Sequence, residues 1–192
     1  DFAKNIYLKL SGNWYYSEGF YEAFNKDFRE NPTKINTTRN TSGEFARTLD
    51  QTYNAIFNFD KQINDHYLSA MLGSEYYDTY SYGIYAAGSG APTDDFRDLQ
   101  LTSSEKDKRS IDSYHTKQRI LSFFGRANYN YQEKYLLSAV LRHDGYSRLV
   151  NKRWGTFPGI SAGWVFSKES FMREFDDIIS FGKLRTSYGL NG

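Results

Sequence analysis

Hydrophobic and polar residues alternate with a period of two over much of the chain. In the first such run, the apolar side chains of Ile6, Leu8 and Leu10 share one face of an extended backbone. A helix would scatter these residues around its axis, so the alternation indicates a β-strand. The same pattern predicts seven strands, at about residues 4–16, 46–59, 66–78, 117–131, 135–144, 153–166 and 180–190.

The predicted connections between these strands are alternately long and short. Residues 17–45 and 79–116 are irregular and predict long loops, whereas residues 60–65 and 132–134 predict tight turns. Residues 167–177 predict a short helix with Ser167 as its N-cap. Long loops on one side and short turns on the other are typical of bacterial outer-membrane barrels, whose strands need about 9–11 residues to cross a bilayer.

The alternation assigns each side chain of these strands to one of two faces. Polar residues that would line the lumen of a barrel are Arg126, Asn128, Asn130, Arg142, Asp144, Lys183 and Arg185. Apolar residues that would face lipid are Leu121, Phe123, Ala127, Leu137, Ala139, Leu141, Ile160 and Trp164. A register slip of one residue would exchange the two sets and place the polar residues in lipid, so each residue is assigned to one face only.

Aromatic content is the informative feature of the composition. Aromatic residues make up 18% of the 192 residues, and several flank the predicted short turns, where amphipathic rings suit a boundary between hydrocarbon and water. Mean hydropathy is −0.71, and no stretch approaches the roughly 20 apolar residues of a membrane helix. A helical membrane protein is therefore excluded, whereas a barrel exposes only alternate residues to lipid and keeps a low mean hydropathy.

The sequence carries no recognisable catalytic, cofactor or metal constellation. It has no cysteine, and its net charge of +1 does not predict a nucleic-acid surface. His143 and Asp144 are neighbours on a strand, so they point to opposite faces and do not converge. We therefore expect no enzymatic activity, no cofactor and no metal.

Three tyrosines in the predicted loop 79–116 are candidate ligand contacts. An aromatic ring offers a flat apolar surface with a polar tip, which suits stacking on a sugar face. A packing role within the loop, or a place in an aromatic girdle, is the equal alternative. The residues are Tyr80, Tyr82 and Tyr85.

Residues 117–192 resemble the barrel of SusC-like (SusC/RagA-like) TonB-dependent transporters, and residues 46–78 do so more loosely. The resemblance lies in the order and spacing of several segments. They are Phe123-Phe124-Gly125-Arg126-Ala127-Asn128-Tyr129, Lys134-Tyr135-Leu136-Leu137, Leu141-Arg142-His143-Asp144-Gly145-Tyr146-Ser147-Arg148, Arg153-Trp154-Gly155-Thr156-Phe157-Pro158-Gly159-Ile160-Ser161-Ala162-Gly163-Trp164, Ser167-Lys168-Glu169-Ser170-Phe171-Met172 and Lys183-Leu184-Arg185-Thr186-Ser187-Tyr188-Gly189.

The resemblance implies an all-β fold, an antiparallel up-and-down transmembrane β-barrel of about 22 strands, of which seven would lie here. Residues 1–192 would then be a partial barrel domain, without the plug and the barrel termini. The resemblance also implies a place in the bacterial outer membrane, energy from TonB through the plug, a SusD-like lipoprotein partner, and oligosaccharide or peptide cargo. The alternative is a soluble or surface-exposed β-rich glycan-binding module without transport.

Overall fold

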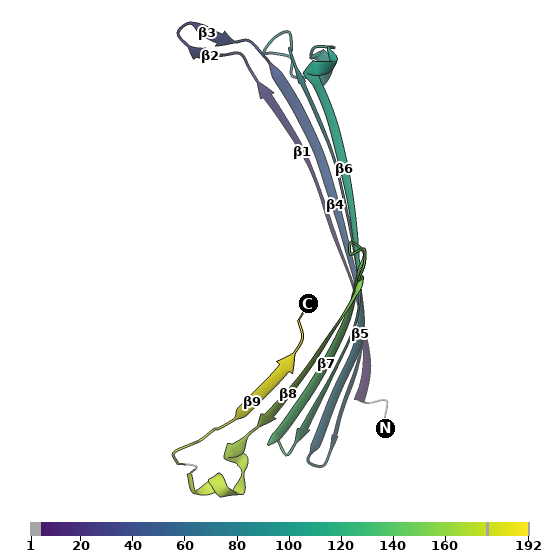
Figure 1. Cartoon of the computed structure of the whole chain (residues 1–192), viewed down its shortest axis with the longest axis vertical. Coiled ribbons are helices and arrows are strands. Elements are labelled where there is room, and N and C mark those ends of the chain that lie inside the picture. The colour runs from purple at the N-terminus through teal and green to yellow at the C-terminus, as the bar shows by residue number, and fades with distance from the viewer. Residues whose placement is uncertain (1–4, 176, 192) are drawn as a thin grey trace. The chain divides into compact units, whose positions relative to one another are not determined.

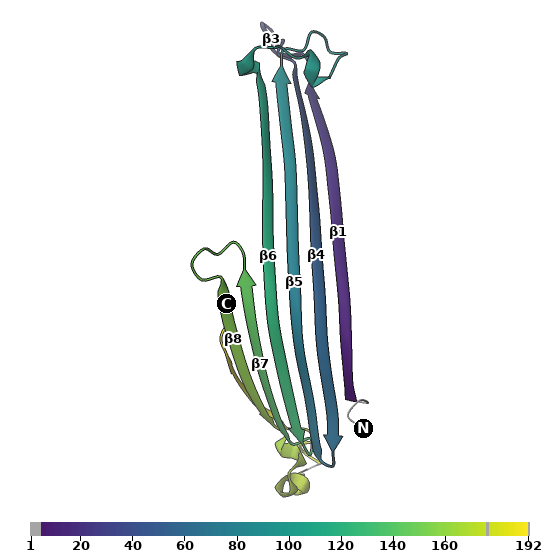
Figure 2. The same ribbon diagram turned by 90° about the vertical axis from the view of Figure 1, so that its right-hand side faces the viewer.

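The computed structural model describes residues 5–175 and 177–191, which are mainly β-strand (Figure 1). Its main sheet has seven strands in the order β1-β4-β5-β6-β7-β8-β9, as Figure 2 shows for most of them. The strands are β1 (Ile6–Asn25), β4 (Asn40–Ile63), β5 (His66–Ser89), β6 (Arg109–Tyr131), β7 (Tyr135–Tyr146), β8 (Trp154–Trp164) and β9 (Leu184–Gly189).

The predicted topology is confirmed. Each strand of the main sheet lies beside its neighbour in chain order, and the sheet is antiparallel. The turn after β4 is shorter than the predicted range 60–65, because β4 continues to Ile63 and leaves only Asn64 and Asp65 to reverse the chain. Asn64 has φ of 50°, a left-handed conformation that asparagine tolerates better than most residues.

Four strands are much longer than the sequence predicted, so the predicted loops 17–45 and 79–116 are wrong over much of their length. Strand β1 continues to Asn25, β4 begins at Asn40, β5 continues to Ser89 and β6 begins at Arg109. Most of these extensions carry polar side chains on both faces, so they lack the alternation that reveals a strand. In β5, Tyr80, Tyr82 and Ile84 do alternate with smaller residues, a signal that sequence reasoning missed. Cross-strand contacts such as Thr48 Oγ1 to Ser81 Oγ, at 3.0 Å, hold the extensions together.

A small hairpin occupies most of what remains of the first predicted loop. Strand β2 (Phe28–Asn31) pairs antiparallel with β3 (Lys34–Asn36). Asn31 Oδ1 accepts hydrogen bonds from the backbone N–H and the hydroxyl of Thr33, at 2.9 and 3.0 Å, which stabilises the turn. The second predicted loop shrinks to residues 90–108, with two short 3₁₀-helices at Leu99–Leu101 and Lys106–Lys108.

The predicted helix 167–177 is also corrected. Two 3₁₀-helices, η4 (Phe166–Lys168) and η5 (Ser170–Phe175), follow β8. Ser167 lies inside the first of them and is therefore not an N-cap. Asp176, near the end of the predicted helix, and Lys4, at the start of the first predicted strand, lie outside the described residues.

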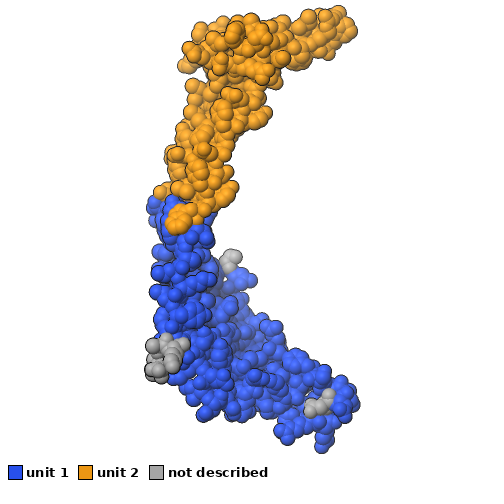
Figure 3. Space-filling view, turned by 180° about the vertical axis from the view of Figure 1, so that it is seen from behind, with its two compact units in different colours: residues 1–13, 51–78, 118–192 blue, residues 14–50, 79–117 orange. Residues whose placement is uncertain are grey.

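The chain divides into two compact units, coloured separately in Figure 3. Unit 1 comprises residues 1–13, 51–78 and 118–192, and unit 2 comprises residues 14–50 and 79–117. Among the described residues, Ala91 and Val165 are the buried hydrophobic side chains, and many large apolar side chains are exposed. The apolar residues therefore do not enclose the core of a two-layered soluble domain. No helix of the described residues is long and apolar enough to cross a membrane.

Candidate functional site: the two faces of the unit 1 sheet

The register of the unit 1 strands separates an apolar face from a polar face. Strand β6 pairs with β7, and β7 with β8, without a register shift, so the faces can be assigned residue by residue. The apolar face carries Leu121, Phe123, Ala127, Leu137, Ala139, Leu141, Ile160, Ala162 and Leu184. The polar face carries Ser122, Arg126, Asn128, Asn130, Ser138, Arg142, Asp144, Ser161, Arg185 and Ser187.

Seven candidate residues of the sequence share the polar face. Six of them lie on β6, β7 or β9 in this register, namely Arg126, Asn128, Asn130, Arg142, Asp144 and Arg185. Lys183 precedes β9, and its Cε lies 3.2 Å from the point where a Cβ on Gly163 would stand, so it lies on the same face. The two-residue alternation therefore brings together side chains that are far apart in the sequence.

Arg142 is the centre of the best-ordered polar cluster. Its Nε donates to both carboxylate oxygens of Asp144 at 2.8 Å, and its Nη2 donates to Ser122 Oγ at 3.0 Å. Glu75 Oε1 lies 3.6 Å from the same guanidinium, which lies 5.7 Å from the ring centroid of Phe124. Ser122 is fully buried beneath this cluster. Charge, hydrogen bonds and ring contact together hold Arg142 against the sheet.

Phe124 lies over a glycine of the neighbouring strand. A Cβ on Gly73 would stand 2.4 Å from the ring of Phe124, far inside van der Waals contact. The absence of a side chain at Gly73 therefore lets the ring lie close to β5, where it contacts the guanidinium of Arg142. Sequence reasoning predicted Arg142 and Asp144 but missed Glu75, Ser122 and Phe124.

A second polar group lies nearer the turns. Ser138 Oγ donates to Asn128 Oδ1 at 2.7 Å across β6 and β7. Asn130 Oδ1 is buried and has no hydrogen-bond partner among the described residues. Asn128, Asn130, Lys183 and Arg185 line one shallow hollow of this face. The hollow offers amide groups and cations to a chain or ligand that lies against the sheet.

Arg148 lies in the turn after β7 and not on a strand. His143 and Asp144 point to opposite faces, as predicted. His143 Nδ1 lies 2.7 Å from Thr156 Oγ1, and its ring stacks on Trp154 at 4.8 Å. No group of three or more His, Cys, Asp or Glu side chains in the described residues is arranged to hold a metal ion.

Aromatic side chains form two rows on the apolar face. The turn-side row contains His66, Tyr131, Tyr135 and Trp164, with the His66 and Tyr131 rings 4.7 Å apart and the Tyr131 and Tyr135 rings 6.2 Å apart. The distal row contains Tyr53, Tyr76 and Trp154, with the two tyrosine rings stacked at 6.5 Å.

The two aromatic rows are equally spaced on the strands that cross both. Ten residues separate His66 from Tyr76 on β5, and ten separate Trp164 from Trp154 on β8. At a rise of about 3.3 Å per residue and a tilt of about 40°, ten residues cover roughly 25 Å along the axis of a barrel. An ion pair, Arg119 Nε to Asp78 Oδ2 at 3.0 Å, lies just beyond the distal row.

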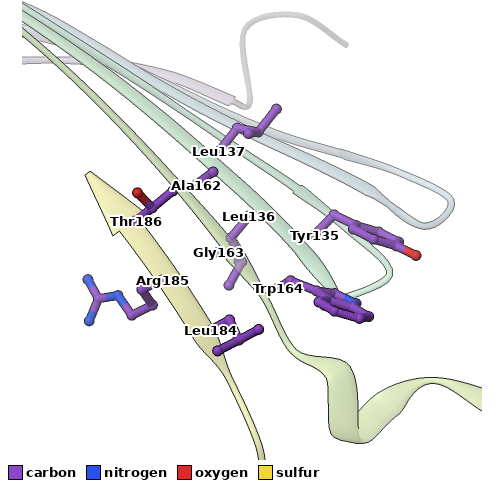
Figure 4. A pocket seen from close by; sticks show the side chains of 9 residues that line it. All are labelled: Tyr135, Leu136, Leu137, Ala162, Gly163, Trp164, Leu184, Arg185 and Thr186. Carbon is purple, nitrogen blue, oxygen red and sulfur yellow. The ribbon is translucent and has the colours of Figure 1, made fainter. Parts of the chain in front are cut away.

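Glu169 binds the polar tips of two side chains of the turn-side row. Its carboxylate accepts hydrogen bonds from Tyr135 Oη at 2.7 Å, from Trp164 Nε1 at 3.1 Å and from Lys134 Nζ at 3.2 Å. These donors, the Tyr135 hydroxyl foremost, hold the pKa of Glu169 below its ordinary value. Figure 4 shows Tyr135 and Trp164 near Leu184, with the guanidinium of Arg185 pointing away from them. Sequence reasoning missed the role of Glu169.

The three candidate tyrosines lie on strand β5, not in a loop, and they do not converge. The alternation of β5 places Tyr80 and Tyr82 on one face and Tyr85 on the other. Arg47 lies 5.8 Å from the ring centroid of Tyr82, which gives that ring a packing role within unit 2. Tyr85 instead lines a polar hollow whose other members include Asn25, Asn40, Ser42, Ser89, Asp107 and Ser110.

An arginine ties the irregular residues of unit 2 to its strands. Arg39 Nε donates to Asp94 Oδ1 at 2.8 Å and pairs with Asp27, while its carbonyl accepts from the N–H of Gly90 at 2.8 Å. The hydrogen bond from Arg39 lowers the pKa of Asp94. This network orders the segment beside the Tyr85 hollow.

The sheet has one exposed apolar face, which aromatic rows bound on two sides, and an opposite face that is polar. This arrangement is that of a wall segment of a membrane β-barrel.

No family model matches the chain. It is 31% identical over 144 residues to the TonB-dependent receptor SusC of Bacteroides thetaiotaomicron, and 33% identical over 138 residues to the TonB-dependent receptor P26 of Formosa agariphila. The chain belongs to the SusC-like TonB-dependent receptors.

These matches cover 73% and 70% of this chain but only 14% of each relative, so the chain spans about one seventh of their length. The fold agrees with a solved structure of the RagAB peptide transporter, at a TM-score of 0.85 and 20% identity. That alignment covers 97% of this chain and 20% of the RagAB chain. The predicted family and fold class are thus confirmed.

Proposed function

We propose that this chain forms part of the wall of an outer-membrane transporter that imports oligomeric nutrients with energy from TonB. The observation that carries the proposal is the pair of aromatic rows on the apolar face. Their separation of roughly 25 Å equals the height of the apolar band of outer-membrane barrels, which aromatic girdles flank on both sides. The ion pair of Arg119 and Asp78 lies just outside this apolar band, beyond the distal row.

In this proposal the apolar face meets lipid. Leu72, Leu141 and Ile160 are 65%, 51% and 62% exposed, and no second layer of the described residues covers them. A soluble protein rarely leaves so large an apolar surface open to water. This observation favours the transporter over the alternative, a soluble glycan-binding module, because such a module would need a second sheet or a layer of helices.

The polar face would line the lumen and hold the plug. A plug that fills a barrel needs polar partners along the wall, and this face offers Arg126, the Asn128–Ser138 pair, the Arg142 cluster, Lys183 and Arg185. The role would be binding and positioning rather than catalysis. The relatives are receptors and a transporter by name, which supports a non-enzymatic function.

The proposed partners are TonB, a SusD-like lipoprotein, and an oligosaccharide or peptide as cargo. The matched relatives are TonB-dependent receptors by name, and RagAB is a peptide transporter by name. Among the three candidate tyrosines, Tyr85 is the one that we still propose as a cargo contact, since its exposed ring lies among amide and hydroxyl groups.

The test uses the complete receptor in its own cell envelope. We expect it in the outer-membrane fraction, resistant to extraction by carbonate, and we expect a lipoprotein to co-purify with it in mild detergent. Uptake of labelled oligosaccharides or peptides should stop when TonB is depleted. Release of the receptor by carbonate, or uptake that is unchanged without TonB, would overturn the proposal.

A further inference from the structure

The connection between β8 and β9 is far longer than the reversal of the chain requires. On the same side of the sheet, Asn64 and Asp65 suffice to join β4 to β5, and residues 132–134 join β6 to β7. Residues 165–183 here contain both η4 and η5. A connection of this length is uncommon and is often functional. The chemistry of its exposed side chains then indicates which environment it contacts.

Residues 165–183 present a concentration of exposed apolar side chains. Ile178 is 81% exposed, Phe181 66%, Phe171 59% and Phe175 48%. Charged residues lie among them, including Lys168, Arg173, Glu174 and Asp177. Alternating apolar and charged groups suit neither water nor the hydrocarbon core, but they suit the boundary between the two.

Contacts join the first part of this segment to side chains of the apolar face. Phe171 lies 6.4 Å from Trp164 between ring centroids, and Phe166 lies 6.0 Å from the same ring. Glu169 binds the polar tips of Tyr135 and Trp164, which belong to the turn-side row. Phe171 therefore lies at the depth of the aromatic row itself.

We propose that residues 165–183 form an interfacial foot, a segment whose apolar side chains rest among the lipid headgroups and upper acyl chains beside the wall. The inference depends on the proposed function, because it needs lipid on the apolar face. Continuity with the turn-side row selects lipid as the occupant. Ile178 and Phe181 enter the membrane interface, while Glu174 stays in water.

The experiment places one spin label at a time on the full-length receptor in phospholipid vesicles. Residues 1–192 contain no cysteine, so Ile178→Cys and, as a second probe, Phe181→Cys introduce unique sites within this chain. Glu174→Cys is the matched control within the foot, and Leu141→Cys reports the lipid-facing wall. Collision rates with oxygen, which concentrates in lipid, and with a water-soluble nickel chelate measure the depth of each label.

We expect the labels at 178 and 181 to collide several-fold less with the nickel chelate than the label at 174, with ready access to oxygen. Equal nickel access at 178, 181 and 174 would overturn the foot. Shielding of 178 and 181 from both reagents would also overturn it and would identify a protein as the occupant. A water-exposed label at 141 would refute the proposed function itself.

Discussion

Substitution of Leu141 by arginine tests the assignment of the two faces. Leu141 lies on the apolar face, opposite Gly125 on β6 and Pro158 on β8. It is six residues from Tyr135 in the turn-side row and four from Gly145, which lies beside Trp154 of the distal row. It is thus one residue from the midpoint of the apolar band. An arginine at the midplane of an outer-membrane barrel costs about 2–4 kcal/mol.

Two further variants separate depth from face. Leu184 lies on the apolar face but pairs with Trp164, so Leu184→Arg stands at the interface and should cost about 0–1 kcal/mol. Ser138 lies on the polar face, two residues from the midpoint of the apolar band, and so is also close to the midplane. Ser138→Arg loses the hydrogen bond to Asn128 and should cost about 1 kcal/mol.

The assay is reversible folding of the full-length receptor into lipid bilayers, followed by urea titration and by the mobility shift of folded barrels in unheated gels. Each variant is compared with the wild type. The comparison of Ser138→Arg with the wild type is repeated in receptors that lack the plug, so that contact with the plug does not add to the loss of stability. Equal penalties for Leu141→Arg and Ser138→Arg, or a larger one for Ser138→Arg without the plug, would refute the assignment of faces.

Two other predictions address packing and pH. Gly73→Ala should displace the Phe124 ring and destabilise the receptor by about 1–3 kcal/mol. The control is Gly19→Ala, which has no atom within 4 Å of the new Cβ and should change the urea midpoint little. Equal shifts of the urea midpoint in the two variants would contradict the close contact at Gly73. The lowered pKa of Glu169 means that its hydrogen bonds stabilise the foot above the ordinary glutamate pKa and are lost as pH falls through the lowered value. Limited proteolysis of residues 165–183 should therefore increase in acid for the wild type, and the increase should be smaller in Glu169→Gln, which keeps the pair of Lys168 with Glu133.

The sequence predicted the unit 1 sheet well because one physical constraint acts on each of its residues. A strand with lipid on one side and polar groups on the other must alternate, so the period of two revealed both the strands and their faces. The partners of Arg142 were not predicted, because they depend on the register between strands. Glu75 lies on β5 and Arg142 on β7, so their contact depends on how β6 pairs with both of these strands.

The lengths of the long strands could not be predicted from the hydrophobic pattern. Strands β4 and β5 each have 24 residues, more than twice the roughly 9–11 that cross a bilayer, so a large part of each must lie outside the hydrocarbon. Outside the hydrocarbon neither face has to be apolar, so the alternation is lost over most of the extensions while the backbone ladder continues. Side-chain pairs such as Asp50 with Thr79 then maintain the pairing. A polar, glycine-rich segment beside a membrane strand is thus as consistent with a continued hairpin as with a loop, and the pattern of hydrophobic residues alone does not distinguish them.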